Sequence, residues 1–345
     1  MSEAPPTKRL KTNTSLSAAN NKDAPSSALA RATKQLLAAQ VSETRQTAAR
    51  AVAAACDDTD DDHEIVSRDE LRPLAEMLQG ADGEAEAAAL ALWKLARNRT
   101  NTTLIGMTGA IPPLVALLQN GTGEAKENSA GALWKLTIIN YYNMYLIAKA
   151  GAIPLLVALL QSGTDVAKQN AAGALWHLAT KNNDVAIATA GAIPLLVVLL
   201  QSGTDVAKET AAGALFRLAT ENHKVAIAEA GAIPPLVALL QNGTNAAKEN
   251  AAGALGNLAD DDHNNRISIA EAGAIPPLVA LLRNGTNTAK ENAAQALEGL
   301  AFDNNDNKVL IAKAGAIAPL VDLLQNGTDK AKGITTYVLG TLSYC

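Results

Sequence analysis

The sequence is short of several residue types, and each shortage excludes a class of protein. Aromatic residues make up 3% of the 345 positions and apolar residues 48%, which favours closely packed helices over β-sheets. The two cysteines, Cys56 and Cys345, are far apart and suit neither a disulfide framework nor a cysteine-rich metal site. No apolar run approaches the length of a membrane span. We therefore expect an all-α protein without a metal site or membrane insertion.

Charge and catalytic motifs are equally sparse. A net charge of −5 gives no electrostatic footprint for nucleic acid. None of the four histidines belongs to a recognisable motif in which it would act as the base for a Ser or Cys nucleophile. The sequence also has neither a phosphate-binding loop nor a zinc motif. The acidic run DDDH (260–263) has ligand types without metal-site spacing. We expect no enzyme activity, no cofactor and no lipid anchor, and a monomer located in the cytoplasm or the nucleus.

The sequence is periodic after a polar N-terminal segment. Residues 1–27 are rich in Pro, Ser, Asn and charge and are predicted to be a disordered tail. Beyond them the motif GAIP, or a close variant, returns in steps of about 40 to 42 residues, the range of helical solenoid repeats. It begins at Gly109, Gly151, Gly191, Gly231, Gly273 and Gly315. We predict a solenoid over residues 28–345, with a degenerate, polar first repeat at about 28–66 and a truncated last one.

One repeat divides into three helices. Pro112 and Pro113 suit the first turn of a helix, Asn120-Gly121 supplies a left-handed stop, and Thr122 caps the next helix, at about residues 124–137. A polar loop then leads to a short helix, as in VAIAEAG (225–231). This order predicts about seven to eight three-helix repeats whose longest helices line a concave surface.

The repeat GAIPPLVALL…NGT…AAGALxNLA resembles the armadillo repeat, in particular the arrays of plant U-box proteins and fungal vacuolar proteins, and more distantly importin-α and β-catenin. The resemblance implies a right-handed superhelix whose groove binds an extended partner segment, with asparagines clamping its backbone. The family's ladder asparagine matches Asn257. At the equivalent place other repeats have Lys94, Lys135, His177 and Arg217, and most of the Trp–Asn ladder of importin-α is absent.

The position that holds Lys94, Lys135, His177, Arg217 and Asn257 in successive repeats lies on one stripe of its helix, together with the residues four and seven positions before it. These stripes combine the cations with glycines and with Asn128, Asn170 and Asn250. We interpret Lys94, Lys135, His177 and Arg217 as cations that select an acidic partner, and the asparagines, including Asn257, as backbone clamps. The alternative is that these positions are merely exposed and free to vary.

Two features of the stripe leave alternatives open. Each glycine costs roughly 1 kcal/mol against Ala in a helix, so it serves either groove depth or close approach of neighbouring helices. The aromatic residues Trp93, Trp134, Trp176 and Phe216 form a row that either lines the groove as partner contacts or packs against the next repeat. The row ends at Gly256, where we expect the surface to become small and neutral.

Three functional hypotheses follow. The first is a scaffold or adaptor that binds an extended, acidic protein segment in its groove. The second is a nuclear transport carrier of the importin-α type, with Lys8, Arg9 and Lys11 as a localisation signal in the tail. The third is a scaffold that binds through its convex face or through NYYNMY (140–145), where Tyr141 and Tyr142 form a second contact site.

Overall fold

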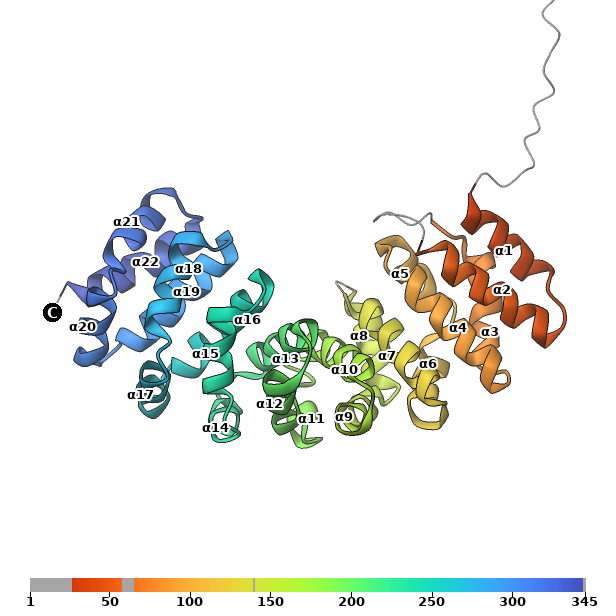
Figure 1. Ribbon diagram of the computed structural model, residues 1–345, viewed down its shortest axis with the longest axis horizontal. Helices are drawn as coiled ribbons and strands as arrows, with labels where there is room; N and C mark the ends of the chain where they lie inside the picture. The colour runs from red at the N-terminus through yellow and green to blue at the C-terminus, as the bar shows by residue number, and fades with distance from the viewer. Residues whose placement is uncertain (1–26, 58–64, 139, 344–345) are drawn as a thin grey trace, which may run out of the picture.

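The computed structural model describes residues 27–57, 65–138 and 140–343, and this part of the chain is helical throughout without a β-strand. The predicted tail, with Lys8, Arg9 and Lys11, lies outside it. Figure 1 shows the helices following one another along a curved row, with α1 (Ala28–Ala38) and α22 (Asp329–Leu342) at opposite ends of the row. The row opens with α1 and α2 (Ser42–Ala55), in the region where the sequence predicts a degenerate first repeat.

The remaining helices repeat in three kinds. The middle helices are α3 (Arg68–Met77), α6 (Ile111–Asn120), α9 (Ala152–Ser162), α12 (Ala192–Ser202), α15 (Ile233–Asn242), α18 (Ile275–Asn284) and α21 (Ile317–Asn326). The long helices are α4 (Asp82–Leu95), α7 (Gly123–Thr137), α10 (Asp165–Leu178), α13 (Asp205–Leu218), α16 (Asn245–Ala259), α19 (Asn287–Ala301) and α22 (Asp329–Leu342). The short helices are α5 (Arg99–Gly106), α8 (Tyr141–Lys149), α11 (Asp184–Thr189), α14 (Lys224–Glu229), α17 (His263–Glu271) and α20 (Asn305–Lys313). This confirms the three-helix repeat and the all-α fold.

Threonine caps start the long helices from α7 onward and also connect the repeats. The Thr122 hydroxyl oxygen accepts a hydrogen bond from the Ala125 amide, as an N-cap should. The same hydroxyl donates to a carboxylate oxygen of Glu86 on the preceding long helix at 3.0 Å. Thr244 caps α16 and bonds Glu209 of α13 in the same manner, at 2.8 Å. One threonine side chain therefore fixes the first residue of a long helix and also holds that helix against the preceding long helix.

The left-handed glycines lie elsewhere than the sequence predicts. Gly121 has φ −74° and ψ 167°, which is extended backbone, so the predicted left-handed stop at Asn120-Gly121 is wrong. A side chain at Gly121 would instead press against the Leu117 carbonyl oxygen, 2.7 Å from an added Cβ. The described glycines with positive φ are those of the GAIP motif, such as Gly151 at 82°. These glycines make the sharp turn from a short helix into a middle helix.

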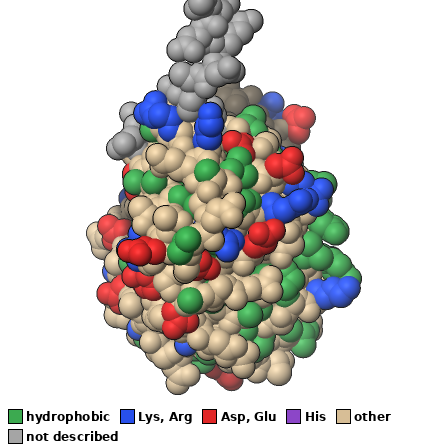
Figure 2. Space-filling view, turned by 90° about the vertical axis from the view of Figure 1, so that its right-hand side faces the viewer, with side chains coloured by type: hydrophobic (Ala, Val, Ile, Leu, Met, Phe, Trp, Pro, Cys, Tyr) green, Lys and Arg blue, Asp and Glu red, His purple; other side chains and the backbone are tan. Residues whose placement is uncertain are grey.

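The core is one continuous layer that the long helices share. Each long helix packs against the long helix before it and the one after it, from α2 and α4 through to α22. Its alanines and leucines are buried between these neighbours, as Ala174, Leu175 and Leu178 are in α10. At the N-terminal end, Figure 2 shows Lys, Arg, Asp and Glu side chains spread over the surface. Charged side chains on a terminal surface help to keep a solenoid soluble.

In the described part of the chain no single helix is long and apolar enough to cross a membrane, although three sharply bent helix pairs satisfy the length and composition criteria together.

Candidate functional site

The aromatic and cationic positions predicted from the sequence come together on one surface. They occupy the last turn of successive long helices that pack side by side, and each is at least partly exposed except Gly256. We call this surface the long-helix face and define it by the paired positions Trp93–Lys94, Trp134–Lys135, Trp176–His177, Phe216–Arg217, Gly256–Asn257 and Glu298–Gly299.

The aromatic rings lie over the glycines of the following repeat. A Cβ added at Gly131 would overlap the Trp93 ring, and one at Gly173 would overlap the Trp134 ring. In the same way the Trp176 ring packs over Gly213 and the Phe216 ring over Gly253, where an added Cβ would lie 2.8 Å from the phenylalanine ring. The glycines therefore serve the approach of the neighbouring repeat. The rings are partly exposed and pack against the following repeat, so the packing alternative is confirmed and lining of the groove is at most a second role.

Three predicted backbone clamps do not face outward. The side chains of Asn128, Asn170 and Asn250 are buried at 3%, 0% and 6% exposure. Their amide groups donate to backbone carbonyls of the preceding long helix, at 3.5, 3.2 and 3.2 Å. The interpretation of these residues as clamps on a partner is therefore wrong in this structure, because the stripe that they occupy is covered by the preceding repeat.

Asn257 is partly exposed but is also used internally. Its amide donates to the Phe216 carbonyl oxygen at 3.2 Å, and its side-chain oxygen accepts from the Gln295 amide at 3.5 Å. These contacts use one of its two N–H donors and one of the two lone pairs on its side-chain oxygen, so a partner could bond Asn257 only from the side that the two contacts leave open. Of the four predicted clamps, only this one reaches the long-helix face.

Lys135 is the cation most confined by its surroundings. Its ammonium nitrogen lies 4.4 Å from the centroid of the Trp134 ring, a cation–π distance. Burial, with the nearby Arg97 guanidinium, lowers the pKa of Lys135 below its usual value. No carboxylate of the described residues lies within 4 Å of Lys135. The structure thus holds an uncompensated positive charge against an aromatic ring.

The other predicted cations differ in how available they are. Lys94 donates to Asp57 at 2.6 Å and is therefore already paired. Arg217 is exposed and, among the described residues, forms no ion pair. Lys135 and Arg217 are accordingly the two predicted cations that remain free for a ligand.

His177 is not a cation at neutral pH. Its ring stacks on Trp176 with centroids 5.0 Å apart. Burial, together with the positive charges of Arg217 and Lys135, lowers the pKa of His177 from 6.5 to about 4. The prediction that His177 selects an acidic partner by its charge is therefore wrong, because burial and, to a smaller extent, the neighbouring cations keep the imidazole neutral.

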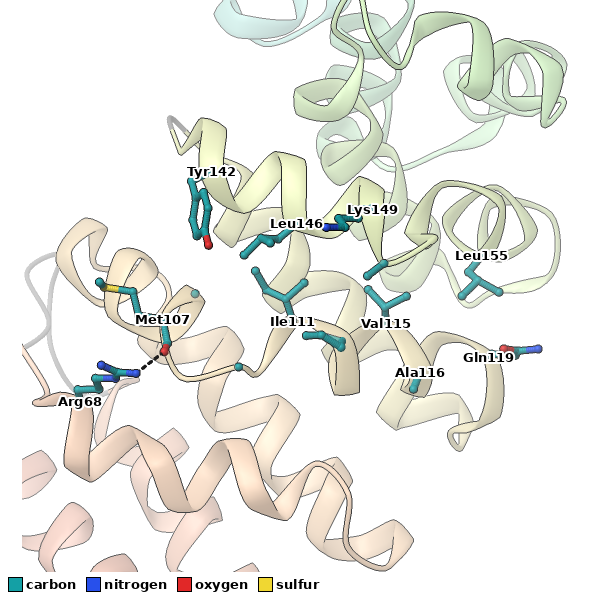
Figure 3. A pocket seen from close by; sticks show the side chains of 14 residues that line it. Arg68, Met107, Ile111, Val115, Ala116, Gln119, Tyr142, Leu146, Lys149 and Leu155 are labelled. Carbon is teal, nitrogen blue, oxygen red and sulfur yellow. Dashed lines mark hydrogen bonds between the residues drawn. The ribbon is translucent and has the colours of Figure 1, made fainter.

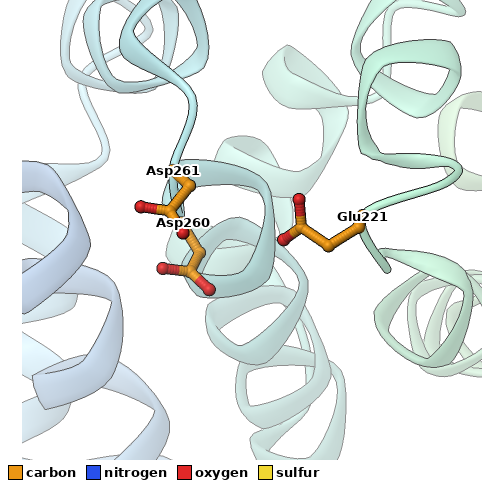
Figure 4. A group of neighbouring side chains, drawn as sticks. All are labelled: Glu221, Asp260 and Asp261. Carbon is orange, nitrogen blue, oxygen red and sulfur yellow. The ribbon is translucent and has the colours of Figure 1, made fainter.

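Beyond Asn257 the surface is acidic, although the sequence predicts that it is small and neutral. Asp260 follows α16, and Glu298 of α19 occupies the position that carries aromatic rings in earlier repeats. Burial and the negative charge of Asp260 raise the pKa of Glu298. Glu221, Asp260 and Asp261 gather in the adjoining loops, as Figure 4 shows. Repeat positions compared one by one could have shown the change from ring to carboxylate at Glu298.

This acidic group is not assigned as a metal centre. The three carboxylates are exposed, and their ligand atoms lie within 4.8 Å of one another. The Lys224 ammonium group already bonds a Glu221 carboxylate oxygen at 2.9 Å and the Asp260 carbonyl oxygen at 2.7 Å. A lysine that neutralises part of the charge is sufficient to explain why the carboxylates gather.

The predicted tyrosine site is exposed on short helix α8. Tyr141 is 80% exposed, Tyr142 64% and Tyr145 58%. Tyr142 lies at the edge of a hollow of about 960 Å³ between α5, α6, α8 and α9, shown in Figure 3. At another edge, the Arg68 guanidinium donates to the Met107 carbonyl oxygen at 2.9 Å. The sequence locates the tyrosines but gives no indication of the hollow.

The fold and these repeats match known proteins. The family model of the armadillo/beta-catenin-like repeat matches residues 98–138, 144–180, 220–260, 262–302 and 304–345. No curated protein sequence matches the chain. The crystal structure of an engineered protein is 26% identical, covering 92% of this chain and 78% of that one, with a TM-score of 0.73.

Two designed proteins are also similar over part of the chain. A computationally designed armadillo repeat protein for modular peptide recognition is 26% identical, covering 67% of this chain and 99% of that one, with a TM-score of 0.59. A designed armadillo repeat protein in complex with the peptide (KR)4 is 24% identical, covering 67% and 99%, with a TM-score of 0.58. At that identity the second likeness shows the fold alone.

Proposed function

The chain belongs to the armadillo/β-catenin-like repeat family, and on that premise we propose that it is a protein-binding scaffold whose long-helix face holds an extended, acidic segment of a partner. The designed relative for modular peptide recognition supports a peptide as the ligand. The observation that carries the acidic preference is Lys135, a half-buried ammonium group against Trp134 with Arg97 nearby and no carboxylate of the described residues within 4 Å.

An acidic ligand would relieve an electrostatic cost that the protein bears alone. Burial and neighbouring like charges lower the pKa values of Lys135, which lies near Arg97, and of His177, which lies near Arg217 and Lys135. A carboxylate bound beside Lys135 replaces repulsion with attraction in a partly desolvated site, where charges interact more strongly than in water. The rings beneath the cations offer apolar contact to the ligand's neighbouring side chains.

The spacing of the free cations predicts a motif. Lys135 on α7 and Arg217 on α13 are separated by one intervening long helix. Packed helices lie about 8–10 Å apart, so two steps cover roughly 16–20 Å. An extended chain advances about 3.3 Å per residue, so two acidic residues about five or six positions apart would reach both cations.

Panning a random peptide display library on the full chain tests the proposal. The Lys135→Glu/Arg217→Glu variant serves as counter-target, and Lys34→Glu/Lys313→Glu, which reverses two exposed lysines on α1 and α20, is the matched charge control. We expect acidic peptides that bind the parent and the control but lose more than tenfold in affinity on the face variant, at an unchanged melting temperature. Basic peptides, or acidic peptides that bind all three proteins equally, would overturn the acidic preference.

A further inference from the structure

Two hollows flank short helix α8. The first, of about 960 Å³, is lined on the α8 side by Tyr142, Leu146 and Lys149 (Figure 3). The second, of about 790 Å³, is lined by Tyr141, Met144, Tyr145, Lys149 and the loop 180–183. We call the helix surface between them the α8 ridge and define it by Tyr141, Tyr142, Tyr145 and Lys149. All three tyrosine side chains are exposed on this ridge.

The ridge is where the chain departs from its own repeat. Tyr142 stands nine residues before the glycine of the next GAIP motif, and the same position holds Asn182, Asn222 and Asn264 in later repeats. The equivalents of Tyr145 include Val185 and Val225. Residues that only build the solenoid would be expected to follow the repeat, as the buried alanines and leucines do. Large exposed aromatic side chains at these positions indicate a different role.

A local packing change accompanies the first hollow. Gly106 lines it, while the five equivalent residues of the other repeats are Ala148, Ala188, Ala228, Ala270 and Ala312. A Cβ at Gly106 would overlap the side-chain oxygen of Asn143, whose amide bonds the carbonyl oxygens of Thr102 and Leu136. Next to it, Met107 is 54% exposed. The glycine thus lets Asn143 join α5, α7 and α8 at the place where the hollow opens.

The chemistry of both hollows is apolar and cationic. Ile111, Val115 and Leu155 line the first, and Met144 and Ile153 line the second. None of the residues that line either hollow is acidic, although Asp and Glu outnumber Lys and Arg in the chain. Arg68, Lys149 and Lys181 are the charged residues among them. A ligand with apolar side chains and carboxylates would match this surface in shape and charge.

We infer that the α8 ridge binds a protein segment that places an apolar side chain in each hollow and directs carboxylates to Arg68, Lys149 and Lys181. A macromolecular partner is favoured because the two hollows lie on different flanks of one helix, with exposed tyrosines between them. Tyrosine, methionine and arginine are among the side chains enriched in protein interfaces, and the rim of an interface is polar. This site is separate from the long-helix face and does not depend on it.

Variants built from the chain's own residues test the ridge with little risk to folding. Tyr142→Asn/Tyr145→Val installs the side chains of equivalent repeats, and Lys149→Thr installs that of Thr189. The random peptide library is panned in parallel on the full chain, the tyrosine variant and the Lys135→Glu/Arg217→Glu variant. We expect a class of peptides, rich in both apolar and acidic residues, that binds the parent and the face variant but loses at least tenfold in affinity on the tyrosine variant.

For one recovered peptide, Lys149→Thr should weaken binding about threefold to tenfold, and less so at high salt because the contact is a partly exposed ion pair. The inference is overturned if no recovered peptide depends on Tyr142 and Tyr145, or if the dependent peptides lack carboxylates. If only the proposal for the long-helix face is wrong, no recovered peptide loses affinity on the Lys135→Glu/Arg217→Glu variant, while some still depend on the two tyrosines. The two proposals are therefore judged separately. Thermal melting of each variant confirms that the fold is retained.

Discussion

The two halves of the long-helix face share a scaffold and differ in charge. From α4 to α13 the final turn carries an aromatic ring followed by Lys94, Lys135, His177 or Arg217. At α16 and α19 the same positions hold Gly256 and Glu298, with Asp260 nearby. Both halves bear like charges close enough to shift the pKa values of their neighbours. The repeat therefore fixes where side chains are displayed and leaves their chemistry free.

The halves also show that a ring and a glycine form one structural unit across two repeats. Each of the four rings is received by a glycine on the next long helix. Where Gly256 removes the ring, the receiving residue is Gln295 instead of glycine. At Gly256 an added Cβ would lie 3.3 Å from the Ala296 backbone nitrogen, so α16 and α19 approach each other directly. The aromatic ring is thus absent from α16 at the same place where the glycine that would lie under it is absent from α19.

The largest expected effect comes from filling a receiving glycine in the N-terminal half. Gly173→Ala would gain roughly 1 kcal/mol of helix propensity, yet its Cβ overlaps the Trp134 ring. Overpacking costs about 1–3 kcal/mol, and a Cβ that overlaps several atoms of one ring belongs at the upper end of that range. After the propensity gain is subtracted, we expect a net loss of about 2 kcal/mol in the free energy of unfolding. Urea denaturation monitored by circular dichroism measures it.

Gly333→Ala in α22 is the matched control, because no atom lies within 4 Å of its added Cβ. It should stabilise the protein by about 0.5–1 kcal/mol. The double variant Trp134→Ala/Gly173→Ala should show a coupling energy of opposite sign to the single loss, since the overlap is gone. Equal stability of Gly173→Ala and Gly333→Ala would break the pairing of ring and glycine.

The pairing also marks the limit of what the sequence predicts. Helix number, the threonine caps and the location of the core depend on neighbouring residues in one repeat, and these predictions are confirmed. The ring over Gly173 and the bond from Asn170 to the Glu127 carbonyl oxygen join residues about 40 positions apart. A single helical stripe contains both an exposed part and a part covered by the preceding repeat, so periodicity alone assigns Asn170 and His177 to the same partner-binding face.

A smaller effect should separate the halves by pH. The folded pKa of His177 is lowered to about 4, so the unfolded chain binds a proton more readily between pH 6.5 and 4. The stability from neutral His177 is full above pH 6.5 and declines as the pH falls toward 4. At pH 5.5 the loss relative to pH 7 is about 1 kcal/mol. His177→Gln should lack this loss in urea titrations at the two pH values.

Glu298 should respond in the opposite direction. Its folded pKa is raised, so the protonated form is favoured by folding, and the resulting stability is present below pH 4.5 and lost as the pH rises through the folded pKa. Glu298→Gln should therefore remove a gain on acidification, whereas His177→Gln removes a loss. The same sign in both variants would contradict the assignment of opposite electrostatic character to the two halves.

The smallest expected effect is at the receiving position of the C-terminal half. Gln295→Ala changes the residue equivalent to Gly173 into the same alanine, but no ring approaches it from Gly256. The substitution loses one long hydrogen bond to Asn257, at 3.5 Å, and gains a few tenths of a kcal/mol in helix propensity. We expect the free energy of unfolding to change by less than about 0.5 kcal/mol. A loss as large as that of Gly173→Ala would mean that the tolerance of this position is set by the helix pair itself and not by the ring that the preceding repeat supplies.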